Sequence, residues 1–315
     1  MAYVSKSENS YITTSLLAGI RADGRSPTDY RNISLEIGVV PVANGSARAR
    51  VGETEVVAAI KLEVEDVGEG ENEGRDGGRV LCHVSCTPSA YPHHSLSALD
   101  ELSDELSSLL QSILSHTLTP SEQLTLVPGK KAWFISLDAL ILSDAGNAHD
   151  ALFIAARAAL WDLRIPYTRG IEFDIKDGEV VVGDSEGIGR MIGRKRTVDF
   201  ELPDLLDDGV PLEGRDSLPV CISLNLLPPT HFLDASLQEE QSVLSRLLLF
   251  FSFPQPSPTS TLYGTRFIGP NELPFNMLKP LVKDGEKYAR ELAEALNKKL
   301  KQEESQVSAP MSAFG

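Results

Sequence analysis

The stretch Leu142-Ser143-Asp144-Ala145-Gly146-Asn147-Ala148-His149-Asp150-Ala151 marks the point where an apolar strand is expected to turn sharply into an alanine-rich helix. We predict the strand over Trp133–Leu142 and the helix over Ala148–Asp162. A strand-glycine-helix turn aims free backbone N–H groups and the positive end of the helix dipole at one point. The backbone of this turn is therefore suited to binding phosphate.

The side chains of the turn do not supply the cation that phosphate chemistry would need. Asn147, Ala148 and His149 follow Gly146, no arginine is present, and Asp150 would repel an anion. Asn147 and Asp150 are interpreted instead as a capping-box-like pair that satisfies the helix's own N–H donors. Local chemistry alone favours a structural turn over a working phosphate site.

Length and charge limit the possible classes of protein. The 315 residues can form one large domain or two smaller ones. A formal net charge of -16 argues against a free-standing nucleic-acid binder, because sequence-independent affinity comes from lysine and arginine. Any contact with nucleic acid must be local or shared with other chains. No apolar run approaches membrane-spanning length, and we expect no membrane contact.

The segments before the turn predict a sheet followed by a helix. Strand-like runs at Asn32–Val40, Gly45–Val51 and Glu55–Glu65 predict an antiparallel meander, and Arg79–Thr87 predicts a further strand. A helix follows with Ser97 as its N-cap and one apolar face, formed by Leu99, Leu102, Leu106, Leu109, Leu110, Ile113 and Leu114. Its opposite face carries serines and acids without arginine, which indicates a solvated or interface surface.

The second half repeats the order of strands followed by a helix. Strands are predicted at Leu218–Leu226, Val243–Phe253 and Leu262–Ile268, and an amphipathic helix at Leu281–Leu300. Between the halves lies a basic cluster, formed by Arg190, Arg194, Lys195 and Arg196. It could contact RNA or a partner protein, or it could be a solvated loop that balances nearby aspartates, and the loop is favoured.

Other chemistries find little support in the sequence. The histidines lack the spacing of a zinc or iron site, and no nucleophile elbow, Walker loop or dinucleotide fingerprint is present. We therefore expect no metal and no cofactor. The acidic stretch Asp234–Glu240 could hold magnesium or act in acid-base catalysis, or Ser236 and Glu239 could form a capping box there.

Several motifs in order resemble the RNase PH family over nearly the whole chain. They are Arg21-Ala22-Asp23-Gly24-Arg25, Asn44-Gly45-Ser46-Ala47-Arg48, the run Gly129–Leu142, Asp144-x-Gly146-Asn147 with Asp150-Ala151, and Asp234-Ala235-Ser236 with Glu239-Glu240. The resemblance implies an α+β fold in which two related β-α halves, similar to ribosomal protein S5 domain 2, form one unit. We accordingly expect an N-terminal helical segment over 1–22, an RNase PH-like domain over 23–300 and a flexible tail over 301–315. Within that domain we expect a first half at about 30–168, a connecting insertion at 183–216 and a second half at 217–300.

The resemblance also implies a function. Family members assemble into hexameric rings around an RNA channel, and active members carry a phosphate-gripping arginine in the turn and further arginines on the preceding helix. Here Gly146, Asn147, Ala148 and His149 form a degenerate phosphate site, and the position of the family's catalytic aspartate falls near Glu240-Gln241-Ser242. We therefore expect no catalytic residues.

The expected protein is a non-catalytic, structural ring subunit of the eukaryotic RNA exosome that supports 3′-5′ RNA processing, including rRNA maturation. Its implied partners are the other RNase PH-like ring subunits, RNA-binding cap subunits, an associated hydrolytic ribonuclease and RNA in the channel. Nucleus, nucleolus and cytoplasm are the implied locations. The alternatives are an active phosphate-dependent 3′-5′ exoribonuclease of the same family and a free-standing RNA-binding protein.

Overall fold

The first half of the chain builds a six-stranded sheet. The structure, a computed structural model, describes residues 4–67, 79–118, 122–127, 130–173, 196–202, 209–254, 259–270 and 272–307. The sheet has the order β1-β2-β3-β6-β4, with β5 also paired to β6, and only β4 runs parallel to its neighbour. Its strands are β1 (Ile33–Ile37), β2 (Gly45–Val51), β3 (Thr54–Asp66), β4 (Val80–Cys86), β5 (Thr125–Val127) and β6 (Lys131–Ser143). The predicted meander is thus confirmed.

The second half builds a four-stranded antiparallel sheet in the order β12-β11-β13-β14. Its strands are β11 (Val220–Leu227), β12 (Thr230–Phe232), β13 (Arg246–Ser252) and β14 (Thr261–Ile268). All three strands predicted here form, with the second beginning later, at Arg246. The two sheets give the α+β architecture expected from the sequence.

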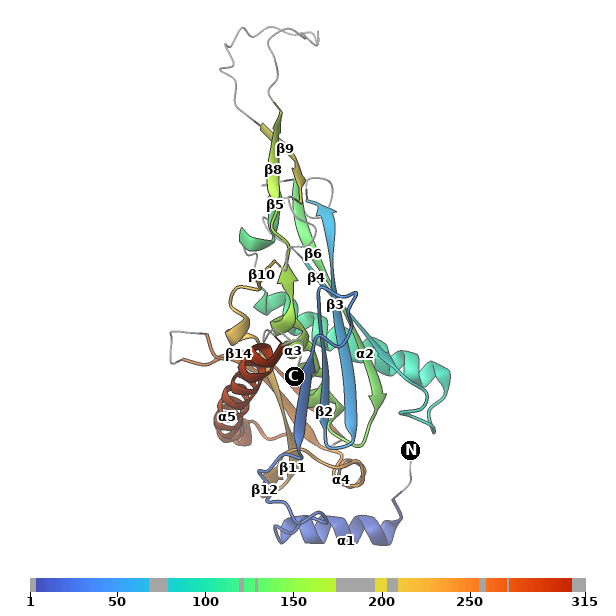
Figure 1. Ribbon diagram of the computed structural model, residues 1–315. Coiled ribbons are helices and arrows are strands. Elements are labelled where there is room, and N and C mark those ends of the chain that lie inside the picture. Colours follow the sequence, from blue (N-terminus) through green and yellow to red (C-terminus); the bar gives the residue numbers. More distant parts are fainter. Residues whose placement is uncertain are drawn as a thin grey trace, which may run out of the picture.

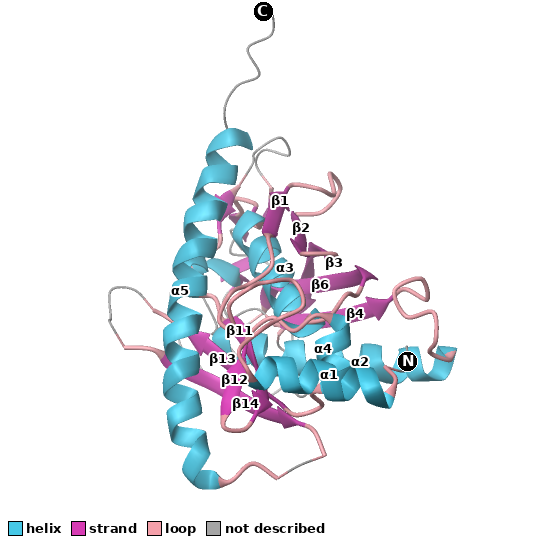
Figure 2. Cartoon of the chain, turned by 90° about the horizontal axis from the view of Figure 1, so that it is seen from below, coloured by secondary structure: helices cyan, strands magenta, loops and turns pink. Residues whose placement is uncertain are grey.

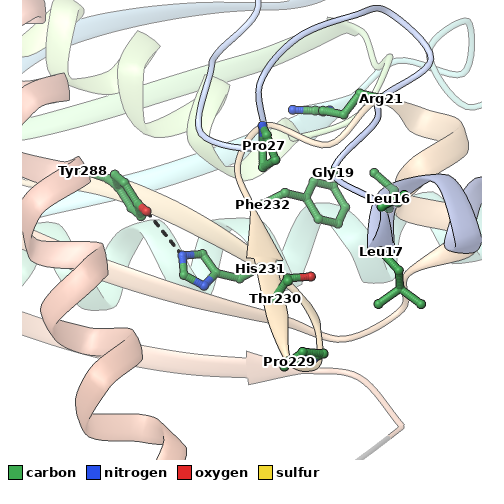
Figure 3. Close-up of a pocket in the computed structure, with 11 residues that line it drawn as sticks. Leu16, Leu17, Gly19, Arg21, Pro27, Pro229, Thr230, His231, Phe232 and Tyr288 are labelled. Atoms are coloured by element: carbon green, nitrogen blue, oxygen red, sulfur yellow. Dashed lines mark hydrogen bonds between the residues drawn. The ribbon is translucent and has the colours of Figure 1, made fainter.

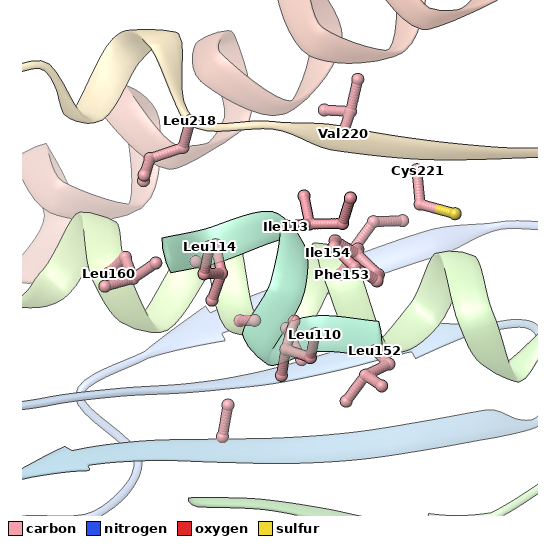
Figure 4. Close-up of a cluster of buried hydrophobic side chains, with 14 of the residues drawn as sticks. Leu110, Ile113, Leu114, Leu152, Phe153, Ile154, Leu160, Leu218, Val220 and Cys221 are labelled. Atoms are coloured by element: carbon pink, nitrogen blue, oxygen red, sulfur yellow. The ribbon is translucent and has the colours of Figure 1, made fainter. Parts of the chain in front are cut away.

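Helix α3 (Ala148–Asp162) forms with the predicted bounds and lies between the two sheets. Almost every side chain of α3 is buried, because its alanines let strands approach closely while Leu152, Phe153 and Ile154 fill the core. Figure 4 shows Phe153 and Ile154 on the side of the helix that faces Val220 and Cys221 of β11. The turn singled out in the sequence therefore starts the central helix of the fold.

The other helices lie at the periphery of the two sheets (Figures 1 and 2). They are α1 (Lys6–Leu17), α2 (Leu96–Thr117), α4 (Leu237–Ser242) and α5 (Phe275–Val307), with 3-10 turns η1 (Glu122–Leu124) and η2 (Arg215–Ser217). The short strands β7 (Arg164–Ile165) and β10 (Val210–Pro211) pair with each other, as do β8 (Arg169–Phe173) and β9 (Arg196–Glu201). Helix α5 continues to Val307, so this part of the expected flexible tail is helical. Among the described residues, no helix has both the length and the apolar composition to cross a bilayer.

Helix α2 differs from its prediction at its cap and on its polar face. Its N-cap is Ser95, whose Oγ accepts a hydrogen bond from the Ala98 N–H at 3.3 Å. The predicted cap at Ser97 is wrong because the helix starts two residues earlier than predicted. The polar face is not simply solvated. Ser103, Ser107 and Gln111 form a polar stripe that accepts hydrogen bonds from backbone N–H groups of β4.

The polar stripe of α2 closes the open edge of β4. Cys86 N–H donates to Ser103 Oγ at 3.2 Å and Val84 N–H to Ser107 Oγ at 2.8 Å. Cys82 N–H donates to Gln111 Oε1 at 2.6 Å, and Gln111 Nε2 donates to the Val80 carbonyl at 2.6 Å. The spacings match because four helical residues rise about 6 Å and two strand residues about 6.6 Å. Edge N–H groups that would otherwise be unpaired are satisfied by side chains.

Candidate functional site

The turn before α3 is held against the start of α4. Gly146 has φ +100°, and a Cβ there would lie 2.5 Å from the carbonyl oxygen of Ala235. Leu237 N–H, at the first residue of α4, donates to the Ala145 carbonyl at 2.8 Å. Glycine is needed at position 146 because of both the backbone angle and this close approach. The acidic stretch 234–240 is thereby brought to the turn, 90 or so positions earlier in the chain.

Three successive backbone N–H groups of the turn are already hydrogen-bonded within the protein. Ala145 N–H donates to Thr54 Oγ1 at 3.0 Å, and Gly146 N–H donates to Asp144 Oδ1 at 2.8 Å. Asn147 N–H donates to Glu240 Oε1 at 3.1 Å. They lie immediately before the first N–H groups of α3, which begins at Ala148. Oxygen atoms of the protein therefore occupy the approach to the start of the helix.

Glu240 is itself held by an arginine. Arg246 Nη1 donates to Glu240 Oε1 at 2.7 Å, and both side chains are mostly buried. Burial raises the pKa of Glu240, and the charge of Arg246 partly offsets this effect. Arg246 thus neutralises the carboxylate at the turn instead of facing an open anion site.

The predicted capping pair of Asn147 and Asp150 is wrong. Asn147 has a left-handed backbone (φ 59°) and its side chain makes no cap hydrogen bond. Its Nδ2 instead donates to Asp150 Oδ2 at 3.1 Å and to Asp234 Oδ1 at 3.0 Å. The amide is drawn away from the helix N–H groups because two buried carboxylates, one of them distant in sequence, compete for it.

Asp150 faces the interior. It is fully buried and accepts hydrogen bonds from the Tyr30 hydroxyl at 2.8 Å and the Ser223 hydroxyl at 2.6 Å. Burial raises the pKa of Asp150, although these hydrogen bonds lower it in part. Asp150 therefore joins α3 to β11 and to the segment before β1. Its carboxylate is directed into the core and does not face an anion at the turn, as its sequence position had suggested.

The turn does receive a cation, from a residue that its local sequence does not reveal. Arg31 Nη1 donates to the Ala145 carbonyl at 2.9 Å and Nη2 to the Gly146 carbonyl at 2.8 Å. Arg31 Nε and Nη2 also bind the Asp234 carboxylate, at 2.9 and 2.7 Å. Burial alone would raise the pKa of Asp234, but its hydrogen bonds and ion pair with Arg31 hold that pKa below its ordinary value. The guanidinium of Arg31 is therefore bound both to the carbonyl groups of the turn and to the Asp234 carboxylate.

Two further arginines bind the acidic stretch 234–240. Arg25 Nη1 donates to Asp234 Oδ2 at 2.9 Å. Arg21, whose side chain is fully buried, donates from Nε and Nη2 to the two oxygens of Glu239 at 2.9 and 2.6 Å. Glu239 also accepts from the Ser236 N–H at 2.8 Å, as the predicted capping box requires. No group of three or more potential metal ligands gathers in the part of the chain that the structure describes.

His149 does not replace the absent arginine. Burial, together with the charges of Arg246 and Arg266, lowers the pKa of His149 to about 3. Its imidazole is neutral at pH 7 and adds no positive charge for an anion. Ala148 beside it is a buried methyl group.

A cavity of about 540 Å³ lies away from the turn, between α1, β12 and α5 (Figure 3). Its walls are largely apolar and include Leu16, Pro229 and Phe232. His231 lies 3.5 Å from the Tyr288 hydroxyl, and burial lowers its pKa. Arg21 also lines this cavity, but its guanidinium is bound to the carboxylate of Glu239.

A search of protein-family models matches residues 29–166 to RNase PH, described as the 3′ exoribonuclease family, domain 1. The exosome complex component Rrp42 of Thermococcus gammatolerans is 30% identical over 235 residues, which cover 74% of this chain and 75% of the relative. The chain belongs to the RNase PH family. An RRP42 protein of Dictyostelium discoideum is 27% identical over 292 residues, covering 78% of this chain and 84% of the relative.

Solved structures show the same RNase PH fold. A chain of the Archaeoglobus fulgidus exosome with RNA bound to the active site superposes with a TM-score of 0.66, at 22% identity, covering 91% of this chain and 96% of that one. Rice Rrp46 gives a TM-score of 0.55 at 17% identity, covering 89% and 100%. The resemblance stated from the sequence motifs is therefore confirmed.

Within this RNase PH chain, the predicted site residues fall into two groups. Gly146, Asn147, Ala148 and His149 lie together at the start of α3, beside Arg31, Asp234 and Glu240. Of the predicted basic cluster, Arg190, Arg194 and Lys195 lie outside the described residues, and Arg196 is the first residue of β9. Contact of this basic cluster with RNA or a partner protein stays a prediction. Arg31 and Arg246 were missed because neither stands near the turn in sequence.

Proposed function

We propose that this protein is a ring subunit of an RNA exosome and that it does not itself catalyse phosphorolysis. Two findings support the exosome role: the relatives named above are exosome components, and the fold matches an exosome chain over 91% of this protein. The non-catalytic role rests on the geometry of the turn before α3.

The observation that carries the proposal is the hydrogen bond from Asn147 N–H to Glu240. A phosphate placed at this helix start would have to displace a carboxylate that is also bound to Arg246 at 2.7 Å. Two anions at one site repel each other, and a buried charge that loses its partner costs about 3–5 kcal/mol. Charge-assisted stabilisation of a reacting phosphate needs free donors, and here the nearest ones are in use.

On this proposal the chain closes the ring, shapes the RNA channel and leaves catalysis to other subunits. RNase PH-like ring neighbours, RNA-binding cap subunits and an associated hydrolytic ribonuclease would be its partners, with RNA passing through the channel. The charge of -16 suits a subunit whose neighbours supply the basic lining. We also propose rRNA maturation and RNA turnover as its processes, in nucleus, nucleolus and cytoplasm.

The test combines assembly and activity measurements on the full-length chain. The chain is purified with its native partners, and the intact complex is weighed by native mass spectrometry. The isolated chain is given RNA and inorganic phosphate, and released nucleoside diphosphates are counted. We expect a stoichiometric hetero-oligomer and no phosphate-dependent release. A monomer that releases nucleoside diphosphates would establish the alternative, an active exoribonuclease, and salt-sensitive RNA binding by the isolated chain would establish a free-standing RNA binder.

A further inference from the structure

The edges of the two main sheets are protected to different degrees. The β4 edge is closed by the polar stripe of α2, and β12, at one edge of the second sheet, has three residues. Strand β14, at the other edge, has eight residues (Figure 2). Long open edges invite other chains to pair with them, and proteins usually shorten or cover such edges. The remaining edge strand of the two sheets, β1, has five residues, so β14 is the longest of the edge strands that the structure describes.

The register shows which backbone groups of β14 point outward. Leu226 N–H donates to the Ser245 carbonyl at 2.8 Å, so the backbone groups of Ser245 face β11. Backbone groups alternate sides along a strand, so those of Leu248 face β14, where they meet its partner Arg266. The backbone N–H and C=O of Thr265 therefore point away from β13.

The same alternation applies to Phe267, two residues further on. Within the described ranges, no hydrogen bond reaches the outward backbone groups of Thr265 or Phe267. The strand, whose sequence is TLYGTRFI, contains β-branched and aromatic residues but neither proline nor lysine. The β-branched and aromatic residues favour pairing with another strand, and its one charged residue, Arg266, is paired with Glu105 of α2.

The surroundings of β14 indicate what kind of segment would pair with it. A groove of about 340 Å³ runs between α2 and β14, and Leu109, Ile113 and Tyr263 contribute apolar walls. Alternate side chains of an added strand could enter this groove. The exposed acidic residues Asp100, Glu101, Asp104 and Glu105 stand on the part of α2 that precedes the groove-lining residues, and Glu105 forms an ion pair with Arg266 of β14. These charges favour a segment flanked by lysine or arginine.

We propose that β14 is a docking edge, to which an extended segment of a neighbouring subunit adds as a fifth strand. Basic side chains flanking that segment face the acidic end of α2. This inference rests on the proposed role as a ring subunit and names the edge through which one neighbour binds. The contrast with β4 supports it, because the same helix that borders the groove closes the β4 edge and leaves the β14 edge open.

Hydrogen exchange tests the edge directly. Exchange is followed by mass spectrometry in the full-length chain alone and in the co-purified complex. We expect the outward amides of Thr265 and Phe267 to exchange quickly in the isolated chain and at least about tenfold more slowly in the complex. The β4 amides, which α2 already binds, form the internal control and should not change. A complex that assembles without slowing exchange in 261–268 overturns the inference and leaves the ring proposal standing.

A pair of variants provides the second test. Thr265→Pro removes one outward N–H and no hydrogen bond of the β13–β14 ladder, and Gly264 before it tolerates a following proline. Thr265→Ala keeps the N–H and serves as the matched control. We expect T265P to bind the remaining subunits about tenfold more weakly than T265A, as expected for one interchain hydrogen bond. Equal binding overturns the inference.

Two further outcomes are decisive. A concentration-dependent homodimer that slows exchange in 261–268 would assign the edge to a second copy of this chain and overturn the proposed occupant. A wild-type chain that joins no other subunit would overturn the ring proposal and this inference together. The melting temperature of each variant, measured alone, separates loss of the edge from loss of the fold.

Discussion

The Glu240 carboxylate accepts a hydrogen bond from the backbone N–H of Asn147 at 3.1 Å, across 93 positions of sequence. A helix N-terminus binds anions through such N–H groups, and here the anion belongs to the protein. The same carboxylate accepts a hydrogen bond from Arg246. The negative charge of Glu240 is therefore stabilised both by the start of α3 and by the guanidinium of Arg246. The turn keeps the geometry of an anion site while its donors stabilise the junction of the two halves.

Loss of the Arg31 side chain should strongly destabilise the fold. Arg31→Ala removes four hydrogen bonds to Asp234 and to the Ala145 and Gly146 carbonyls, and it leaves Asp234 with fewer partners. We expect a loss of about 3–5 kcal/mol in the free energy of unfolding, measured with urea. The control, Arg48→Ala, removes a partly exposed ion pair with Glu55 and should cost at most about 1 kcal/mol. Similar costs for the two variants would refute a structural role specific to Arg31.

Gly146→Ala should cost more than an alanine at another glycine with positive φ. A Cβ at Gly146 would lie 2.5 Å from the Ala235 carbonyl oxygen, whereas at Gly24 (φ +77°) nothing lies within 4 Å. Gly24→Ala should cost about 1–2 kcal/mol from backbone strain alone. Gly146→Ala should cost about 3 kcal/mol or more, because α4 must also shift. Thermal melting of both variants gives the comparison, and equal shifts would show that α4 does not constrain the turn.

His149 should make the fold sensitive to acid. The folded state binds a proton at His149 only near pH 3, whereas the unfolded chain binds one below about pH 6.5, so acidification favours unfolding. The stability contribution is therefore present above pH 6.5 and is lost as pH falls toward 3. Relative to wild type, His149→Asn should reduce this loss by at most about 1.4 kcal/mol per pH unit.

Urea unfolding at several values between pH 7 and pH 5 measures that slope. The matched control is His93→Asn, which makes the same change at an exposed loop position. If His149→Asn follows the wild-type slope, the imidazole of His149 does not lose its proton on folding.

Sequence patterns predicted the elements whose signals are local. The strand Gly45–Val51 and the helix Ala148–Asp162 form with the predicted bounds, because turn residues and alanine spacing mark their ends. The polar face of α2 could not be interpreted in this way. Ser107 binds Val84 of β4, and a serine that satisfies an edge strand has the same sequence pattern as a solvated one.

The ion pairs of the site could not be predicted from neighbouring residues, because their partners are distant in sequence. Arg31 and Asp234 are 203 positions apart, and only the folded sheets bring them together. The absence of an arginine from the turn was visible in the sequence, whereas the presence of Arg31 beside its carbonyls was not. The segment 21–31 could have indicated it, because its arginines outnumber its aspartates. At least one of these arginines would then need an acidic partner from elsewhere in the chain.

An arginine restored to the turn should not produce phosphorolysis. In Ala148→Arg the new guanidinium would stand near the carboxylate of Glu240, which already binds the Asn147 N–H and pairs with Arg246. The added cation would therefore pair with Glu240 or turn to solvent, and α2 contributes no arginine for RNA. We expect no phosphate-dependent release of nucleoside diphosphates by the variant, alone or in the assembled complex.

A double variant, Ala148→Arg with Glu240→Gln, removes the competing charge. It should bind inorganic phosphate measurably in calorimetry while still failing to turn over RNA. Turnover by Ala148→Arg alone would show that a single cation is all the turn lacks and would contradict the proposal that its anion position is blocked by Glu240.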